Sequence, residues 1–388
     1  MSSSRRNMLV LLLVACLALG GLTAADRLYV DRAVNTDPAT DHTDNQLYVQ
    51  RAQTILDGEL LYRDVETQTP PLINYLLVPP VALGGSPLAF EIYFSFFIAL
   101  TVLALFAVLS RLDEKKALWV ALAFLFVPTT LVTPTLARQD ESIVVFFFLL
   151  PLLLMYVSRS RHLYALFAAL GIWLKMHSVF LVPPLLLKSN RRQALQEMGV
   201  MAGVSLAVTL PFFLLALDQF VWHLRFYLLG EGDEALQGIS LWRILESQGY
   251  AVPSLLLIGV MGTALLVIYY HSYRHRLGIW KTVALTLLAY FVLYPKIHYE
   301  YFLILFAVLI PLLIESKKMM GMTYGMAALS GITLLIEQRY LDWGTASAHD
   351  AVMVALAGLC MAALDVLLVL TFRHLLTTRT WLDGKPLF

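Results

Sequence analysis

Long runs of apolar residues recur along this chain, and they constrain its fold more than any other feature. Hydrophobic residues make up 59% of the 388 residues and charged residues only 14%, whereas a soluble domain carries about 25% charged residues. A chain so poor in charge cannot cover itself with polar surface. Because the apolar runs are long rather than short and alternating, they predict an all-α polytopic membrane protein.

About 12 of these runs are candidates for membrane spans. They lie near residues 8–25, 88–110, 117–133, 142–157, 163–174, 177–187, 198–217, 251–270, 282–294, 301–314, 319–336 and 351–371. The pair 163–174 and 177–187 is short for two full crossings at about 1.5 Å per residue, so two short spans and a re-entrant hairpin both remain open. A total of about 10 to 13 spans agrees with the pattern, since span boundaries are soft by several residues.

The distribution of basic residues predicts the topology. Clusters of Lys and Arg, such as Lys115 and Lys116, fall in every second loop and near both termini. The positive-inside rule then predicts cytoplasmic termini in the cell membrane, with 26–87 and 218–250 as the long extracytoplasmic loops. The chain has no internal repeat, so a single membrane domain over residues 1–388 is expected.

The first long loop is rich in carboxylates, which spanning a bilayer does not require. Thr43 and Gln46 fit a capping box, which predicts a helix that starts at Asp44. Asp44 would then lie in the first turn, where the helix macrodipole favours an ionised carboxylate. An ionised carboxylate is what a general base requires; an ordinary capping anion is the alternative interpretation of Asp44.

The rest of this loop carries helix boundary signals. Asp57 and Gly58 predict the end of the first loop helix near residue 56. Pro70 and Pro71 predict the start of another helical segment. The apolar run 72–83 that follows is about 12 residues long, which is short for a span and typical of an interfacial or re-entrant helix.

This order of residues resembles the GT-C superfamily of glycosyltransferases, which use polyprenyl-phosphate-linked sugars. The closest likenesses are to protein O-mannosyltransferases, lipid A aminoarabinose transferases and bacterial or archaeal mannosyltransferases. The matching positions are Asp44, Tyr48, Ala52, Gly58, Tyr62, Pro70, Pro71 and Leu72. In that superfamily the first large extracytoplasmic loop carries the catalytic acid. The resemblance therefore implies a GT-C-like fold with Asp44 as catalytic base, and a substrate loop made by Tyr48, Tyr62, Arg63, Asp64, Pro70 and Pro71.

Three further segments resemble the same superfamily. The residues that carry this likeness are Arg138, Asp140 and Glu141 before a Phe-rich run, Lys175 after the glycine-bearing run with Gly171, and Lys296 and His298 in a late outer turn. Sugar transfer with inversion needs a carboxylate that takes the acceptor proton and cations that stabilise the departing phosphate. Asp140 or Glu141 is therefore expected to orient the base, to hold the acceptor or to replace the base.

The basic residues among these positions are candidates for binding the donor phosphate. They are Arg138, Lys175, Lys296 and His298, and each could form charge-assisted hydrogen bonds to phosphate oxygens. Each also has a simpler interpretation. A lysine at a loop edge can extend to the lipid headgroups, and an exposed ion pair contributes little.

Composition and motifs limit the cofactors and partners. The 28 basic and 27 acidic residues give no reason to expect a nucleic-acid partner, and no nucleotide-binding motif is present. No spacing predicts a zinc site, so no metal ligand is assigned, although a divalent cation between Asp44 and Asp140 is left open. The expected partners are a polyprenyl-phosphate-linked sugar, membrane lipid, and a lipid, glycan or protein acceptor.

Two other classes of function compete with a transferase. A multi-span transporter or flippase for a lipid-linked or anionic substrate agrees with the number of spans. However, the two halves of the chain show no matching hydropathy, and only the first long loop has the Asp and Pro-Pro pattern. A non-catalytic scaffold leaves the clustering of charged residues on one predicted face unexplained.

Overall fold

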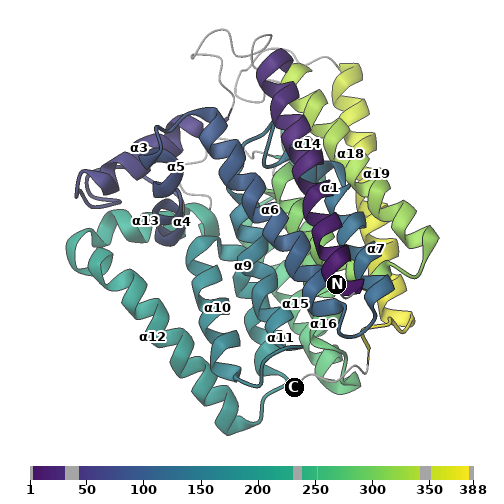
Figure 1. Ribbon diagram of the computed structural model, residues 1–388. Helices are drawn as coiled ribbons and strands as arrows, with labels where there is room; N and C mark the ends of the chain where they lie inside the picture. The colour runs from purple at the N-terminus through teal and green to yellow at the C-terminus, as the bar shows by residue number, and fades with distance from the viewer. Residues whose placement is uncertain (1–2, 31–42, 230–237, 251, 341–350, 384–388) are drawn as a thin grey trace. The chain divides into compact units, whose positions relative to one another are not determined.

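The computed structural model of this chain describes residues 3–30, 43–229, 238–250, 252–340 and 351–383 (Figure 1). Regular secondary structure in these ranges is helical, and no β-strand occurs among them. The predicted all-α class is therefore confirmed for the described part of the chain.

Six described helices are long and apolar enough to cross a membrane. They are Ser3–Val30, Pro87–Leu109, Arg191–Leu215, Leu255–His275, Lys317–Ile336 and Ala351–Thr377. Six shorter apolar helices are Pro71–Ala82, Glu141–Leu154, Arg161–Leu174, Met176–Leu186, Ile279–Leu293 and Tyr299–Leu313. These helices confirm the membrane-protein class, while the expected number of about 12 crossings stays a prediction.

The expected span at 117–133 forms two helices instead of one. Helix α7 covers Glu114–Leu125 and α8 covers Pro128–Val132. Because proline has no backbone N–H and its ring clashes with the preceding turn, Pro128 opens a new helix rather than continuing α7.

The chain forms two compact units, and each is described separately. The first comprises Met1–Phe126 and Thr130–Tyr227, and the second comprises Val127–Thr129 and Leu228–Lys385. The single domain expected over residues 1–388 stays a prediction.

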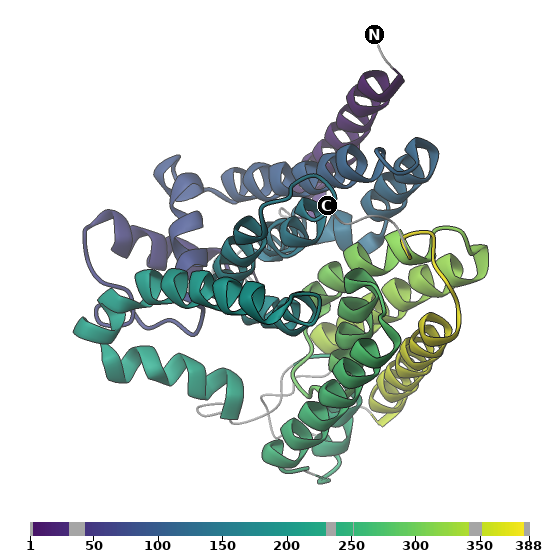
Figure 2. The ribbon, with the colours of Figure 1, turned by 90° about the horizontal axis from the view of Figure 1, so that it is seen from below.

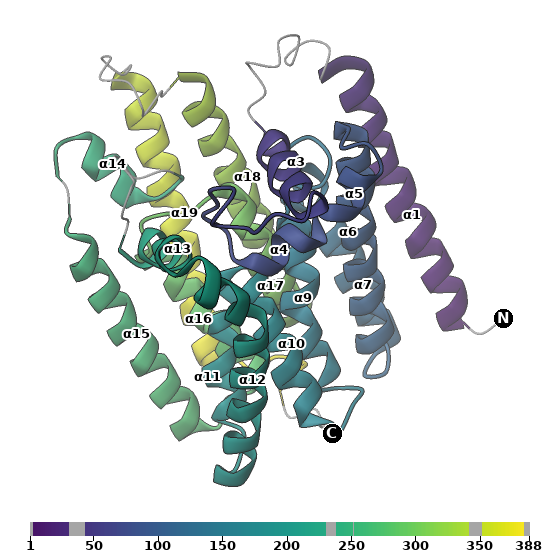
Figure 3. The ribbon, with the colours of Figure 1, turned by 90° about the vertical axis from the view of Figure 1, so that its left-hand side faces the viewer.

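The first unit is built around α6. Its elements are α1 (Ser3–Ala25), the π-helical turn η1 (Asp26–Val30), α3 (Asn45–Leu56), α4 (Pro71–Leu76), α5 (Val78–Ala82), α6 (Pro87–Leu109), α7, α9 (Glu141–Leu154), α10 (Arg161–Leu174), the 3₁₀ turn η3 (Met176–Leu181), α11 (Val182–Leu186), α12 (Arg191–Leu215) and α13 (Leu217–Leu229). Helix α6 packs against α1, α7 and α9, and α10 packs against α9 and α12. The three short helices α3, α4 and α5 lie together at one end of this unit (Figures 1 and 3).

The first loop helix is placed one residue later than predicted. Asp44 is its N-cap and makes no side-chain capping bond, so the capping box assigned to Thr43 as N-cap is wrong. The C-terminal prediction is confirmed, since Asp57 is the C-cap and Gly58 follows with a φ of +77°. A left-handed backbone of this kind favours glycine, because in other residues the Cβ crowds the adjoining carbonyl oxygen.

The predicted start of the next segment is also confirmed. Pro70 is the N-cap of α4 and Pro71 is its first residue. The apolar run after it divides into the short helices α4 and α5, which meet at Leu77. Its expected position at the membrane interface stays a prediction.

The second unit contains the last helices of the chain. They are α14 (Leu241–Ser247), α15 (Ser254–His275), α16 (Ile279–Leu293), the 3₁₀ turn η4 (Tyr299–Tyr301), α17 (Phe302–Leu313), α18 (Lys317–Tyr340) and α19 (Ala351–Thr377). Helix α19 packs against α18 and α16, and the yellow α19 can be followed beside the yellow-green α18 in Figure 2. Every residue of α17 is buried, as expected for a helix that is apolar on all sides.

Candidate functional site

Tyr48 connects the first loop helix to the turn that precedes α9. Its hydroxyl donates a hydrogen bond to Oε1 of Gln139 at 3.2 Å and accepts one from the backbone N–H of Asp140 at 3.3 Å. The side chain is buried because its ring packs against Phe90 and Phe94 of α6. Helix α3 is thereby fixed to the turn that carries two of the predicted site carboxylates.

Lys175 forms ion pairs with both of these carboxylates. Its Nζ atom lies 2.9 Å from Oδ1 of Asp140 and 2.6 Å from Oε1 of Glu141. Asp140 and Glu141 are buried, and the Lys175 side chain is only 12% exposed. Two buried carboxylates on one ammonium group form a strong local network, since low polarity strengthens attraction between the charges.

The backbone at the end of α10 places Lys175 toward these acids. Lys175 is the C-cap of α10 and has an extended backbone with φ −155° and ψ +135°. Gly171, one turn earlier, lets η3 approach closely, because a Cβ there would lie 2.6 Å from Oγ of Ser178. The chain therefore leaves the helix sharply at Lys175.

Asp44 is the partly exposed carboxylate of this group. It caps α3 one turn before Tyr48, whose backbone N–H donates to the Asp44 carbonyl at 3.0 Å. The pKa of Tyr48 is raised well above its usual value, first by burial and then by the negative charges of Asp140, Asp44 and Glu141, while Lys175 opposes the shift. The buried Tyr48 hydroxyl thus lies at the turn whose carboxylates pair with Lys175, and Asp44 lies one turn before Tyr48 in α3.

Arg138 lies in a different environment from the one expected of a phosphate ligand. It is buried, with Nη2 3.6 Å from Oδ2 of Asp26 and Nε 3.7 Å from Oε1 of Glu91. Arg27 donates a hydrogen bond to the same carboxylate of Glu91. We refer to Asp26, Arg27, Glu91 and Arg138 as the four-charge cluster. A donor phosphate at Arg138 would have to compete with two carboxylates already present.

The four-charge cluster is the main feature that the sequence interpretation missed. Asp26 and Arg27 lie in η1, directly after the first apolar helix, and Glu91 lies inside the apolar helix α6. The signal that could have identified Glu91 is its charge within a candidate span, because such residues are costly unless they have partners.

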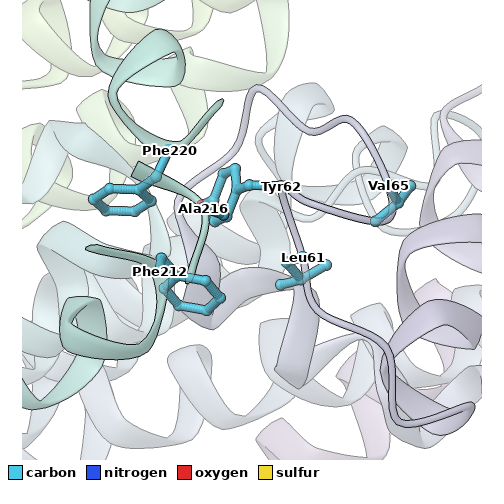
Figure 4. Close-up of a cluster of buried hydrophobic side chains, with 6 residues drawn as sticks. All are labelled: Leu61, Tyr62, Val65, Phe212, Ala216 and Phe220. Atoms are coloured by element: carbon cyan, nitrogen blue, oxygen red, sulfur yellow. The ribbon is translucent and has the colours of Figure 1, made fainter. Parts of the chain in front are cut away.

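Tyr62 of the predicted substrate loop is a core residue. It packs in a buried cluster with Leu61, Val65, Phe212, Ala216 and Phe220, shown in Figure 4. Its ring meets Phe212 and Phe220 edge to face at centroid distances of 5.2 and 5.1 Å. Its hydroxyl donates to the Thr69 carbonyl at 2.8 Å, so Tyr62 anchors the loop.

The neighbouring charged residues of this loop form a surface pair. Nη2 of Arg63 lies 2.7 Å from Oδ2 of Asp64, and the Arg63 side chain is 49% exposed. The Arg63 hydrogen bond lowers the pKa of Asp64 to about 2, with help from the Leu60 backbone N–H. Pro70 and Pro71 set the start of α4, as described above.

Lys296 and His298 belong to the second unit, which is described separately from the unit that contains Asp44. Ser240 donates to the Pro295 carbonyl at 2.5 Å and Trp242 Nε1 donates to the Val292 carbonyl at 3.1 Å. These bonds hold the turn that carries Lys296. Burial lowers the pKa of Lys296 to about 8.

The described residues contain no group of three or more His, Cys, Asp or Glu side chains placed to hold a metal ion. No family model and no curated protein sequence matches this chain.

Proposed function

We propose that this chain is an integral-membrane glycosyltransferase of the GT-C type. It transfers a hexose or pentose, with a mannose-like sugar favoured, from a polyprenyl-phosphate donor to a lipid, glycan or protein acceptor. The protein lies in the cell membrane with cytoplasmic termini, and the reaction takes place on the extracytoplasmic face. Nucleic acid has no part in it.

One observation carries this proposal. Three distant segments of the sequence meet at Tyr48. Its hydroxyl bonds the turn that carries Asp140 and Glu141, both of which pair with Lys175, and Asp44 caps the helix of Tyr48 one turn earlier. Asp44 is the partly exposed carboxylate, while Asp140 and Glu141 are buried against Lys175. A base must reach its substrate, so the exposed carboxylate takes that role.

The chemistry follows from these positions. Asp44 removes the proton from an acceptor hydroxyl. The oxygen of that hydroxyl attacks the anomeric carbon from the side opposite the phosphate. The bond between the anomeric carbon and the phosphate oxygen breaks, and the electron pair leaves with polyprenyl phosphate. Lys175 stabilises that negative charge, sharing its ammonium group with Asp140 and Glu141. The product has inverted configuration.

The test compares sugar transfer by the wild type and by Asp44→Asn in lipid, with a panel of polyprenyl-phosphate-linked radiolabelled sugars. Removal of a general base lowers kcat by about 100-fold or more. The matched control is Asp57→Asn at the other end of α3, an exposed residue that bonds Gln53. Transfer that survives in Asp44→Asn moves the base to Asp140 or Glu141.

A transporter or flippase is the second candidate, and Glu91 favours it, because a carboxylate inside a membrane helix often marks a transport path. The same panel separates the two functions. If the wild type transfers no sugar but moves a lipid-linked donor across the bilayer of a vesicle, the transferase proposal is wrong.

A further inference from the structure

The four-charge cluster joins three separate segments of the first unit. Asp26 and Arg27 come from η1 at the end of the first apolar helix, Glu91 comes from α6, and Arg138 precedes α9. The relative exposures of Asp26, Glu91 and Arg138 are 1%, 0% and 1%. The cluster contains two acids and two arginines, so its formal charge is balanced.

This balance matters because three of the four charges are removed from water, while the Arg27 side chain is 26% exposed. Loss of one member leaves an uncompensated buried charge, which is far more costly than loss of an exposed ion pair. Each arginine has a carboxylate of the cluster close to its guanidinium group. The position of the Arg138 side chain is therefore determined by Asp26 and Glu91.

The Arg138 backbone shows why this position matters for the site. Arg138 has a φ of +51°, a left-handed conformation that is unusual for a residue with a side chain. Such a conformation persists where the surrounding structure holds it. Of the next three residues, Gln139 and Asp140 form hydrogen bonds with Tyr48, and Glu141 pairs with Lys175.

We propose that Glu91 and Asp26 are positioning residues for the reaction. They hold Arg138 in its left-handed conformation and so direct the turn 139–141 toward Tyr48 and Lys175. They touch neither donor nor acceptor. The inference rests on the proposed function for its catalytic consequence, but the coupling between the cluster and the turn can be measured without any substrate.

A purely structural role is the alternative, and the chain offers a matched control for it. Glu197 of α12 is also buried, and Oε1 accepts a hydrogen bond from Nε of Arg161 at 2.5 Å. Oε2 of Glu197 accepts a bond from Ser189. Glu197→Gln therefore breaks the ion pair of a buried carboxylate without touching the turn 139–141.

The first measurement uses a thiol as a reporter on the turn. Gln139→Cys is made in a chain with Cys16 and Cys360 replaced by Ala, and its rate of labelling by a water-soluble maleimide is followed in detergent. Glu91→Gln is expected to raise this rate by on the order of tenfold, because the turn loses its anchor and opens more often. Glu197→Gln is expected to leave the rate unchanged.

The second measurement is sugar transfer per folded molecule, with folded protein determined by size-exclusion chromatography. Glu91→Gln is expected to lower kcat by about 10- to 100-fold, since small misplacement of catalytic groups has effects of this size. Glu91→Asp keeps the charge and is expected to recover most of the lost rate. If Glu91→Gln does not fold, Asp26→Asn takes its place with the same expectations.

The outcomes separate the two proposals. A wild-type chain that transfers no sugar contradicts the proposed function, and the labelling rate then decides alone whether the cluster holds the turn. Unchanged labelling in Glu91→Gln overturns the inference. So does an unchanged kcat in an active enzyme, or an equal loss of kcat in Glu197→Gln.

Discussion

The hydroxyl oxygen of Tyr48 lies 3.3 Å from the backbone nitrogen of Asp140, 92 residues further along the chain. This bond connects a surface-facing loop helix to the turn before α9. The geometry of the candidate base Asp44, at the start of that helix, is therefore linked to that of Asp140 and Glu141 through one phenol.

Tyr48→Phe is expected to destabilise the protein by about 1–3 kcal/mol, because the Asp140 N–H and the Gln139 side chain lose a buried partner. A denaturant titration in detergent measures the change. The control is Tyr93→Phe on α6, a half-buried tyrosine whose ring packs on Phe97 and whose hydroxyl bonds no described residue. An equal loss in both variants would contradict the role of the Tyr48 hydroxyl.

Lys175→Met is expected to cost about 3–5 kcal/mol of unfolding free energy, since it leaves two buried carboxylates without their cation. The same titration applies, with Lys115→Met on the exposed surface of α7 as the control. A Lys175→Met protein as stable as the wild type would show that Asp140 and Glu141 do not depend on this ion pair.

The sequence predicts that Lys296 binds the donor phosphate. If it does, donor binding weakens as the pH rises through about 8, the pKa to which burial lowers Lys296. Below that pH Lys296 is a cation that attracts phosphate, and above it the charge is lost. In Lys296→Arg the charge persists at high pH, so the KM for the donor no longer increases as the pH rises. Lys317→Arg is the control and is expected to show the same increase in KM as the wild type. A wild-type KM that stays constant between pH 7 and 9.5 would remove Lys296 from the donor site.

Gly171→Ala is expected to destabilise the first unit by about 1–3 kcal/mol, because its new Cβ has to displace buried Ser178. Gly199→Ala on α12 is the control, since nothing lies within 4 Å of its added Cβ. Alanine there is expected to be neutral or to stabilise the helix by up to about 1 kcal/mol. Thermal unfolding followed by tryptophan fluorescence distinguishes the two.

The sequence was sufficient for features that depend on neighbouring residues. Gly58 ends the first loop helix and Pro71 starts the next because each acts on its own backbone. The N-cap prediction was wrong by one residue, since Thr43 and Asp44 are both good capping residues and the sequence cannot rank them. Asp140, Glu141 and Lys175, which the resemblance assigned to one site, are paired in the structure, and their role in a site stays a prediction.

Features that depend on distant residues could not be predicted. The sequence placed Tyr62 in the substrate loop, whereas in the structure its ring contacts Phe212 and Phe220, about 150 positions later. No local sequence pattern predicts such distant contacts. Arg138 likewise looked available for phosphate because Asp26 and Glu91 are remote in the sequence. Glu91 lies near the start of the expected span 88–110, and the structure gives it two arginine neighbours that are remote in the sequence.

The aromatic packing around Tyr62 has a consequence for how this protein diverges. Rings at positions 62, 212 and 220 fill one another's space, so a change of size at one of them leaves a void or an overlap at the others. Substitutions at these three positions should therefore occur together among homologues. Arg63 follows Tyr62 in the sequence but is exposed, so substitutions at position 63 do not depend on the three rings.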